Sequence, residues 1–271
     1  MTRFHITVPT RAPERVELPE FVTDLRPPDR GTSHRLVGRA AELAGLDGAL
    51  VPFDPGGLES LVVAAGLLRD SRRIEVIAEF HPGIATPVYA AKLSASSQRY
   101  AGGRLGWRLV VDLDPAVARA QGDFLTGAAR YARAAEFLTV ARGVWDGSGY
   151  GFDGEYFQVL DGGLPASRAP RPFPRVYLSG TSDEALELSA NHADVHVLGP
   201  GDDPALVPDG VAAAVRLPVR AGPDEQLAAE IRTHLDRGVT EFFLEPAAPL
   251  DDAYRIGQRV LPLLEQEVRH G

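Results

Sequence analysis

Glycine and hydroxyl residues stand between a predicted strand and a predicted helix at residues 180–182. The segment 175–179 is rich in β-forming residues, and Gly180, Thr181 and Ser182 lead from it into a helix-like run that begins at Asp183. The exposed N–H groups at a helix start, together with two hydroxyls, could bind the oxygens of a phosphate. The same residues could instead cap the helix, with Ser182 or Thr181 as the N-cap. Taken alone, the pattern favours the cap, because such caps are abundant.

Other groups of reactive residues give weaker evidence for a functional site. The 7 histidines form no HxH or HExxH arrangement, and the chain has no cysteine, so we expect no metal site and no disulfide. No Gly-x-Ser-x-Gly motif is present, which argues against a serine hydrolase. Asp112 and Asp114, near the end of the fourth predicted strand, could act as acid and base, but a solvated loop is favoured there.

Size and charge set the class of protein. The chain has 271 residues, of which 44% are hydrophobic and 24% charged, a composition typical of globular proteins. Its net charge of −9 argues against a nucleic-acid partner and against an anionic membrane, while a small anionic ligand remains possible. The first residues lack a long apolar signal, and no window approaches the roughly 20 apolar residues of a membrane span. These observations predict a cytoplasmic protein.

Predicted strands and helices alternate along the whole chain, which is typical of a parallel sheet with crossover helices. Eight strands are expected, at residues 4–9, 48–53, 74–80, 107–112, 176–180, 195–199, 213–219 and 241–245. Helices are expected at residues 33–44, 58–68, 86–100, 123–144, 183–191, 224–237 and 251–267. This order and length predict an α/β protein with a (β/α)8 TIM barrel, for which about 250 residues is typical.

Two irregularities interrupt the regular alternation. Residues 200–210 are too short and too rich in proline for a normal helix, so the sixth crossover is expected to be a minimal loop or one helical turn. Residues 150–160 alternate around Asp153 and Gly154, which predicts a hairpin. We therefore expect one barrel domain over residues 1–271, with a hairpin and a proline-rich arm at about residues 146–174.

Several phrases, read together, resemble one family. They lie at residues 41–50, 81–87, 99–105, 151–156, 177–182 and 253–257, and include His-Pro-Gly at residue 81 and Tyr-Leu-Ser-Gly-Thr-Ser at residue 177. In this order they resemble the bacterial luciferase-like flavin-dependent monooxygenases, and most closely the alkanesulfonate monooxygenase branch. The resemblance implies a luciferase-like TIM barrel that uses reduced FMN from a separate flavin reductase, and O₂, to oxygenate a small organic substrate. It also implies a homodimer, and some relatives use F420 in place of FMN.

The resemblance assigns a phosphate site to residues on two elements. In the family, the loop that falls here on Gly180, Thr181 and Ser182 holds the flavin phosphate. Tyr131, on a predicted helix, matches a family tyrosine that reaches the same phosphate. Without the family, Tyr131 could equally be a packing aromatic on an amphipathic helix.

Further site residues follow from the family at strand ends. Glu79 and Phe80 fall where the family places the flavin ring, and His81 stands in place of a family arginine. Arg216 matches an arginine over the active site, where a guanidinium suits an anionic substrate. Arg11 takes the place of a first-strand histidine. The alternatives are a turn residue for His81, before a proline, and an arginine directed to solvent for Arg216.

The chain departs from the family pattern at residues that the family uses in its active site. Pro218 stands where sulfonate monooxygenases carry a histidine, and Gly57 where they carry a cysteine. The lid insertion that follows the seventh strand in the family is missing, because residues 220–222 lead at once into the next helix. Three hypotheses remain: an oxygenase that uses reduced FMN, a non-catalytic flavin-binding or structural barrel, and an F420-dependent oxidoreductase.

Overall fold

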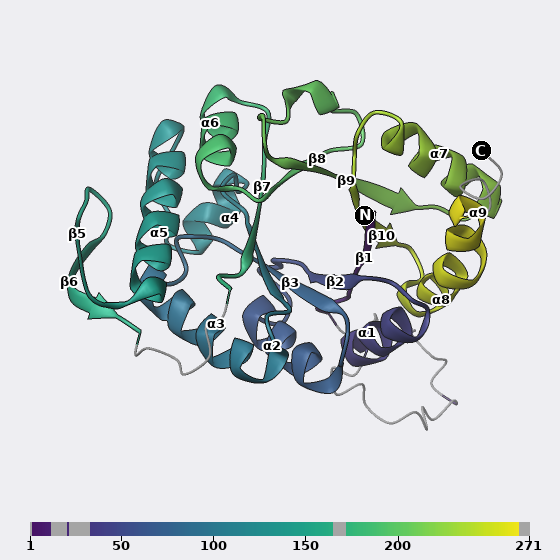
Figure 1. Ribbon diagram of the computed structural model, residues 1–271, viewed down its shortest axis with the longest axis horizontal. Helices are drawn as coiled ribbons and strands as arrows, with labels where there is room; N and C mark the ends of the chain where they lie inside the picture. The colour runs from purple at the N-terminus through teal and green to yellow at the C-terminus, as the bar shows by residue number, and fades with distance from the viewer. Residues whose placement is uncertain (1, 12–20, 22–32, 165–171, 266–271) are drawn as a thin grey trace.

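The computed structural model describes residues 2–11, 21, 33–164 and 172–265, and its long-range pairing forms a closed barrel of parallel strands. The order around the barrel is β1, β10, β9, β8, β7, β4, β3 and β2. Their bounds are β1 Arg3–Thr7, β2 Gly48–Val51, β3 Glu75–Phe80, β4 Leu105–Leu109, β7 Arg175–Ser179, β8 Val195–Leu198, β9 Ala212–Val219 and β10 Glu241–Pro246. The pairing of β1 with both β2 and β10 closes the ring, which helices surround in Figure 1. The predicted (β/α)8 barrel is confirmed.

Helices follow most of the strands, close to the predicted positions. They are α1 Ser33–Leu43, α2 Ser60–Asp70, α3 Pro87–Ala101, α5 Ala128–Asp146, α6 Asp183–His192, α7 Asp224–Leu235 and α8 Pro249–Arg255. Local signals fix their ends: the side chain of Thr86 caps α3 directly before Pro87, and Gly102 ends it with a left-handed φ of 64°. Such signals explain why the sequence locates the helices well.

Two connections of the barrel are short. Between β8 and β9 there is only the 3-10 turn η1 (Pro204–Leu206), which confirms the expected short crossover. Between β9 and α7 the chain has only residues 220–223. The carboxyl ends of these strands are therefore covered by little of the connecting chain.

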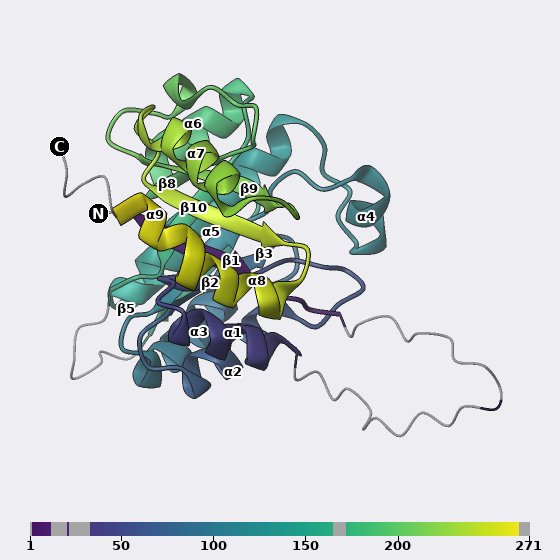
Figure 2. The ribbon, with the colours of Figure 1, turned by 90° about the vertical axis from the view of Figure 1, so that its right-hand side faces the viewer.

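One helix of the structure was not predicted from the sequence. Helix α4 (Pro115–Ala120) begins after Asp114, whose carboxylate accepts hydrogen bonds from the N–H groups of Ala116 (2.8 Å) and Val117 (3.3 Å). The sequence predicted a helix from residue 123, and this start was wrong, because residues 123–127 are not helical. That helix, α5, starts five residues later than expected, after Gly127 with φ 55°. In Figure 2, α4 projects beyond the carboxyl ends of the strands.

The last predicted helix is interrupted. After α8, residues Ile256–Val260 form a π-helical turn (η2) that leads into α9 (Leu261–Glu265). Pro262 has no N–H to donate, which disfavours the regular α-helical pattern there. Gly257 also packs against the backbone of Ala44, since a Cβ at residue 257 would lie 2.1 Å from that carbonyl oxygen. The predicted end at residue 267 lies outside the described residues.

The predicted hairpin is present outside the barrel. It consists of β5 (Ser148–Asp153) and β6 (Gln158–Gly163), which pair antiparallel. The carboxylate of Glu136 on α5 accepts hydrogen bonds from three consecutive N–H groups of the connecting loop, at 2.8, 2.8 and 3.0 Å. Of the proline-rich arm that follows, residues 165–171 lie outside the described residues.

Strand alternation divides the core into two layers. Residues that point into the barrel form one apolar cluster: Leu50, Ile77, Tyr177, Val195, Val197, Ala214 and Phe243. Residues that point outward pack under the helices, where the rings of Phe80, Trp107 and Phe137 meet with centroids 5.3 to 6.2 Å apart. Burying one such ring contributes roughly 1.5–3 kcal/mol. None of the described helices has the length and apolar character needed to cross a membrane.

Candidate active site

Four charged side chains meet above the apolar cluster, near the carboxyl ends of β3, β4, β9 and β10. Glu79 forms an ion pair with Arg108 on the neighbouring strand. The Arg216 guanidinium donates from Nε to Oε1 of Glu245 at 2.6 Å, and its Nη1 lies 3.8 Å from Oε1 of Glu79. Two arginines and two glutamates therefore form one connected and electrically balanced group. Active sites of (β/α)8 barrels lie at this end of the strands.

The group is buried at one side and open at the other. Glu79 and Arg108 are each 5% exposed, whereas the side chain of Arg216 is 34% exposed. Oε2 of Glu79 accepts a hydrogen bond from the N–H of Phe53 (2.9 Å), and Arg108 donates to Oγ of Ser179 (3.3 Å). Burial, and then repulsion by Arg216, lowers the pKa of Arg108 to about 9, so this guanidinium remains protonated at neutral pH.

The structure brings together two of the predicted site residues, Glu79 and Arg216, and adds two that were not predicted. Arg108 follows Trp107 within a strand, so alternation places its side chain inside the barrel if Trp107 points outward. That signal was present in the sequence. Glu245 was predicted only as the end of a strand, because no local pattern relates it to Arg216, 29 residues earlier.

Phe80 lies in the outer layer of the core. It is fully buried, and its ring meets Trp107 edge-on with centroids 5.3 Å apart. Its neighbour Glu79 points inward, so alternation directs the ring of Phe80 toward the helices. The side chain packs between the strand and the helices, so only the backbone of residue 80 could contact a cofactor inside the barrel.

The loop after β7 has the shape expected of an anion site. Gly180 has φ 119°, and a Cβ there would lie 2.7 Å from the Cβ of Ala185, so the close approach of loop and helix requires glycine. The hydroxyl of Ser182 accepts a hydrogen bond from the N–H of Ala185 (3.3 Å), which confirms the predicted helix cap. Capping uses the N–H of Ala185 but leaves the N–H groups of Asp183 and Glu184, in the first turn of α6, to meet an anion.

Tyr131 on α5 lies beside this loop, and so does a carboxylate. The phenol donates a hydrogen bond to Asp112. Burial, followed by that hydrogen bond, raises the pKa of Tyr131 to about 12, and Ser182 lies close enough to lower it in part. Asp183 and Glu184 stand in the first turn of α6. The hydroxyls and N–H groups are thus surrounded by acidic side chains.

His81 lies in a separate buried network. Its Nδ1 is 2.7 Å from the carbonyl oxygen of Val110, and its Nε2 is 2.7 Å from Oδ2 of Asp123. Arg133 donates to both oxygens of Asp123, at 2.9 and 2.7 Å. Burial would raise the pKa of Asp123, but hydrogen bonds from Arg133, a backbone N–H and His81 hold it well below its usual range. With 1% exposure, His81 joins the end of β3 to α5 and does not meet Arg216.

Arg11 lies after β1 and pairs with Asp54, which follows β2. The side chain of Arg11 is 66% exposed, while that of Asp54 is 18% exposed. Asp54 also accepts a hydrogen bond from the N–H of Gly56 at 3.0 Å. A cavity of about 340 Å³ opens beside this pair and extends to Glu245. Arg11 therefore lies on the same side of the barrel mouth as Arg216.

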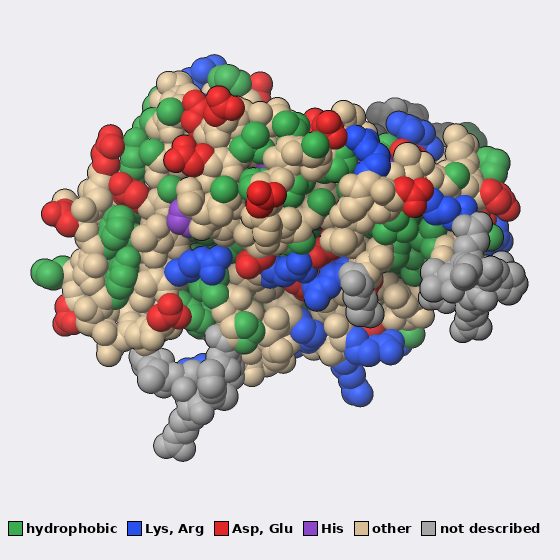
Figure 3. Space-filling model, turned by 45° about the horizontal axis from the view of Figure 1, so that its top comes forward, with side chains coloured by type: hydrophobic (Ala, Val, Ile, Leu, Met, Phe, Trp, Pro, Cys, Tyr) green, Lys and Arg blue, Asp and Glu red, His purple; other side chains and the backbone are tan. Residues whose placement is uncertain are grey.

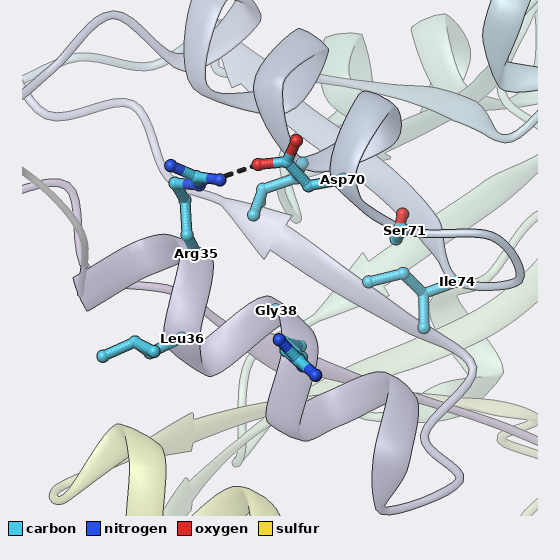
Figure 4. A pocket seen from close by; sticks show the side chains of 8 residues that line it. Arg35, Leu36, Gly38, Asp70, Ser71 and Ile74 are labelled. Atoms are coloured by element: carbon cyan, nitrogen blue, oxygen red, sulfur yellow. Dashed lines mark ion pairs between the residues drawn. The ribbon is translucent and has the colours of Figure 1, made fainter.

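A second pocket, of about 370 Å³, lies outside the barrel between α1 and α2. Figure 4 shows the ion pair of Arg35 and Asp70 (2.7 Å) at its edge. This pocket contains none of the predicted site residues. Within the described residues, no group of three or more His, Cys, Asp or Glu side chains is placed to hold a metal ion.

Comparison with known proteins identifies one family and several solved structures of similar fold. A family model described as luciferase-like monooxygenase matches residues 2–235. The structure of EDTA monooxygenase (EmoA) from Chelativorans sp. BNC1 is similar with a TM-score of 0.78 at 17% identity, over 98% of this chain and 94% of that chain. Long-chain alkane monooxygenase (LadA) has a TM-score of 0.79 at 13% identity, over 98% and 92%.

An F420-dependent secondary alcohol dehydrogenase, solved with an F420-acetone adduct, is similar with a TM-score of 0.74 at 14% identity, over 97% of this chain and 99% of that chain. At such identities the likeness to solved structures shows the fold alone. The family model, in contrast, covers most of the chain, including β1 to β9 and the loop after β7.

Proposed function

The chain belongs to the luciferase-like monooxygenase family, and we propose that it is a flavin-dependent monooxygenase of the two-component type. It would take reduced FMN from a separate flavin reductase and use O₂ to oxygenate a small organic substrate. The observation that carries this proposal is the pairing of an anion-shaped loop at Gly180 with a buried ionic group at Glu79 and Arg216, both at the carboxyl end of one barrel. Bound FMN would supply the redox chemistry at this end.

The residues of the loop fit a flavin phosphate in shape. The glycine lets the chain approach α6 closely, and Ser182, Thr181 and Tyr131 offer hydroxyl donors beside the N–H groups of the first turn. The charge is less favourable, because the phenol of Tyr131 already donates to Asp112. A bound phosphate would have to replace this carboxylate as the acceptor. We therefore expect FMN to bind, but more weakly than a loop without Asp112 would allow.

We favour FMN over F420 on the charge of the same loop. The tail of F420 carries a phosphodiester and carboxylates, which call for nearby basic side chains. In the part of the chain that the structure describes, Asp112, Asp183 and Glu184 stand beside the loop instead. A short tail with one phosphate is easier to accept than a longer polyanion.

Anaerobic titration of the purified protein with reduced FMN tests the proposal. We expect saturable binding that weakens at least tenfold, about 1.4 kcal/mol, when Thr181 and Ser182 are both changed to alanine. The matched control removes two hydroxyls from exposed helix positions, Ser96→Ala with Thr139→Ala, and should bind FMN like the wild type. Unchanged affinity in the Thr181/Ser182 double variant would exclude this loop as the phosphate site.

Arg216→Ala separates catalysis from cofactor binding. We expect FMN affinity within twofold of the wild type, because Arg216 lies on β9, away from the loop after β7. Turnover, measured with a flavin reductase as incorporation of labelled O₂ into product, should fall about 100-fold, or about 2.7 kcal/mol. A variant with full turnover would contradict the catalytic role of this arginine.

A non-catalytic barrel is the second candidate, and specific contacts favour it. Arg216 is held by Glu245, His81 is enclosed by Asp123 and Arg133, and only residues 220–223 join β9 to α7. Such a protein would bind a flavin, or nothing, and give no product that depends on O₂. The sequence motifs resemble those of the alkanesulfonate branch, yet these contacts favour a substrate other than a sulfonate.

We also propose that the protein is a homodimer joined through α2 and α3. Tyr89, Leu93 and Tyr100 lie along one exposed face of α3, with Val62 exposed on the neighbouring α2. The hydroxyl of Tyr100 donates to the carbonyl of Ala65 at 3.4 Å, which joins the two helices. Apolar residues grouped in this way are typical of an interface. A second copy of the same face would cover them.

Light scattering during gel filtration measures the oligomeric state. We expect a dimer for the wild type and a monomer for Val62→Glu. The control is Leu160→Glu, a substitution of the most exposed large apolar residue, on the hairpin strand β6, which should leave the dimer intact. A monomeric wild-type protein would contradict the interface.

A further inference from the structure

The pocket between α1 and α2 has an apolar floor. Leu67 on α2 and Ile74, which directly precedes β3, line it and are 2% and 1% exposed, while Leu36 on α1 stands at its edge with 53% exposure. Gly38 lets the two helices approach closely, because a Cβ there would lie 2.8 Å from Cδ2 of Leu67. A pocket of about 370 Å³ with such walls suits a small molecule that has a hydrocarbon part.

The charged side chains around this pocket leave an excess of positive charge. Oδ2 of Asp70 lies 2.7 Å from Nε of Arg35, and its Oδ1 accepts a hydrogen bond from Nε of Arg69 (3.1 Å). Figure 4 shows Arg35 and Asp70 directed toward each other above the pocket. Burial alone would raise the pKa of Asp70, but the two guanidiniums lower it below its usual value. Two cations therefore share one carboxylate, and both of its oxygens are used.

Arg39, one turn after Arg35 on α1, supplies a further guanidinium. It lines the pocket, is exposed, and forms no ion pair with any residue that the structure describes. The carboxylate nearest to it along the chain, that of Glu42, accepts hydrogen bonds from the N–H groups of Arg72 (2.7 Å) and Arg73 (2.6 Å). Arg39 can therefore bind an incoming carboxylate through two parallel hydrogen bonds without giving up another contact.

The carboxyl end of α2 borders the pocket, and the last carbonyl groups of a helix carry partial negative charge. A single guanidinium from outside the helix meets these groups. Arg104 donates hydrogen bonds to three carbonyl oxygens at this end, those of Leu68 (3.0 Å), Ser71 (3.1 Å) and Ile74 (2.7 Å). The helix end is thus compensated, and the arginines around the pocket determine the sign of its charge.

We propose that this pocket binds a small organic carboxylate, with the carboxylate group on the guanidinium of Arg39 and the hydrocarbon part against Leu67 and Ile74. The proposal does not depend on the proposed function, because the pocket lies outside the barrel and contains no residue of the candidate active site. An amine of the same length would meet the arginines with like charge. An acidic protein surface could contact the same arginines but would leave the cavity unfilled.

Titration calorimetry with three probes tests both parts of this ligand. At pH 7 we expect hexanoate to bind at least tenfold more tightly than acetate, because its additional CH₂ groups reach the apolar floor. Hexylamine should give no saturable binding. Arg39→Gln should lower hexanoate affinity about fivefold, and Leu36→Ala about threefold. The matched control is Arg119→Gln, which changes an exposed arginine of α4 that has no ion pair among the described residues, and should leave binding unchanged.

The proposal is overturned if hexanoate and acetate bind equally, which would mean a general attraction of anions to surface arginines. It is also overturned if Arg39→Gln binds hexanoate like the wild type. Arg216→Ala tests the mouth of the barrel as the competing site: loss of hexanoate binding in this variant, with full binding in Arg39→Gln, would place the anion there. Circular dichroism should show an unchanged fold for Arg39→Gln and Leu36→Ala, since both side chains are exposed. Titration of Arg39→Gln with reduced FMN should match the wild type.

Discussion

The two ends of the barrel contain the same kinds of charged residue in different states. At the amino end, Glu241 is 2% exposed and accepts from Tyr177 (3.1 Å) and Arg175 (2.5 Å), with His5 3.3 Å away. Figure 3, which looks obliquely toward this end, shows acidic and basic side chains side by side in its middle. At the carboxyl end, Glu245 is 35% exposed and offers a free oxygen to a cavity.

The two ends differ less in which charged residues they contain than in how many carboxylate oxygens already have hydrogen-bond partners. Both oxygens of Glu241 are used, and Gly48 packs so closely on His5 that a Cβ would lie 2.4 Å from Nδ1. Burial would raise the pKa of Glu241, but His5 and Arg175 keep it below its usual value. The carboxylate of Glu241 thus joins strands and has no acceptor left for a ligand, although the buried Nδ1 of its neighbour His5 lacks a hydrogen bond within the described residues. The carboxyl end leaves acceptors open, as a binding site must.

The largest expected effect is on stability at the amino end. Glu241→Gln removes the charge that compensates Arg175 in a buried site, and we expect the free energy of unfolding to fall by about 3 kcal/mol. Glu245→Gln, the matched change at the carboxyl end, should cost less than about 1 kcal/mol because that pair is partly exposed. Urea unfolding followed by circular dichroism measures both. Equal losses would remove the distinction between the two ends.

Sequence patterns predict the frame of this contrast but not its contacts. Strand positions follow from runs of β-branched residues, and the hairpin follows from Asp153 and Gly154, so both were predicted. Helix α4 was missed because its six residues are too few to show a helical period. Glu79 and Arg216 were predicted through the family. The pairing of Arg216 with Glu245 depends on the barrel register, which no local pattern records.

The network around His81 offers a test of an intermediate case, because Asp123 is a carboxylate near the carboxyl end whose two oxygens both accept hydrogen bonds. Asp123 has a depressed pKa in the folded state, so its stabilising contribution is complete above its unfolded pKa of about 3.9 and is lost as the pH falls through the lower folded value. We expect Asp123→Asn to lower the free energy of unfolding by about 2 kcal/mol at pH 5. The difference from the wild type should shrink below about pH 4.

Urea unfolding of both proteins between pH 3 and pH 6 measures this dependence. The control is Asp203→Asn, because Asp203 forms an exposed ion pair with Arg237 and caps η1 by accepting from the N–H of Ala205, which asparagine can also do. The difference should be below about 0.5 kcal/mol. A loss for Asp123→Asn that stays constant down to pH 3 would show that its carboxylate does not stabilise the network through its charge.

The smallest expected effect concerns the loop after β7, where a satisfied contact stands inside a proposed binding site. Tyr131 donates to Asp112, and this hydrogen bond contributes to the raised pKa of Tyr131. Asp112→Asn removes a negative charge next to the proposed phosphate position, so we expect reduced FMN to bind about fivefold more tightly, or about 1 kcal/mol.

The phenol gives a second, independent measurement. Asp112→Asn should lower the pKa of Tyr131 from about 12, seen as earlier phenolate absorbance in an alkaline titration, with Tyr131→Phe used to identify its signal. A lower phenol pKa without tighter FMN binding would place the phosphate elsewhere. Both changes together would mean that Asp112 restrains an anion site by occupying its donor, so that this loop combines the saturation of the amino end with the openness of the carboxyl end.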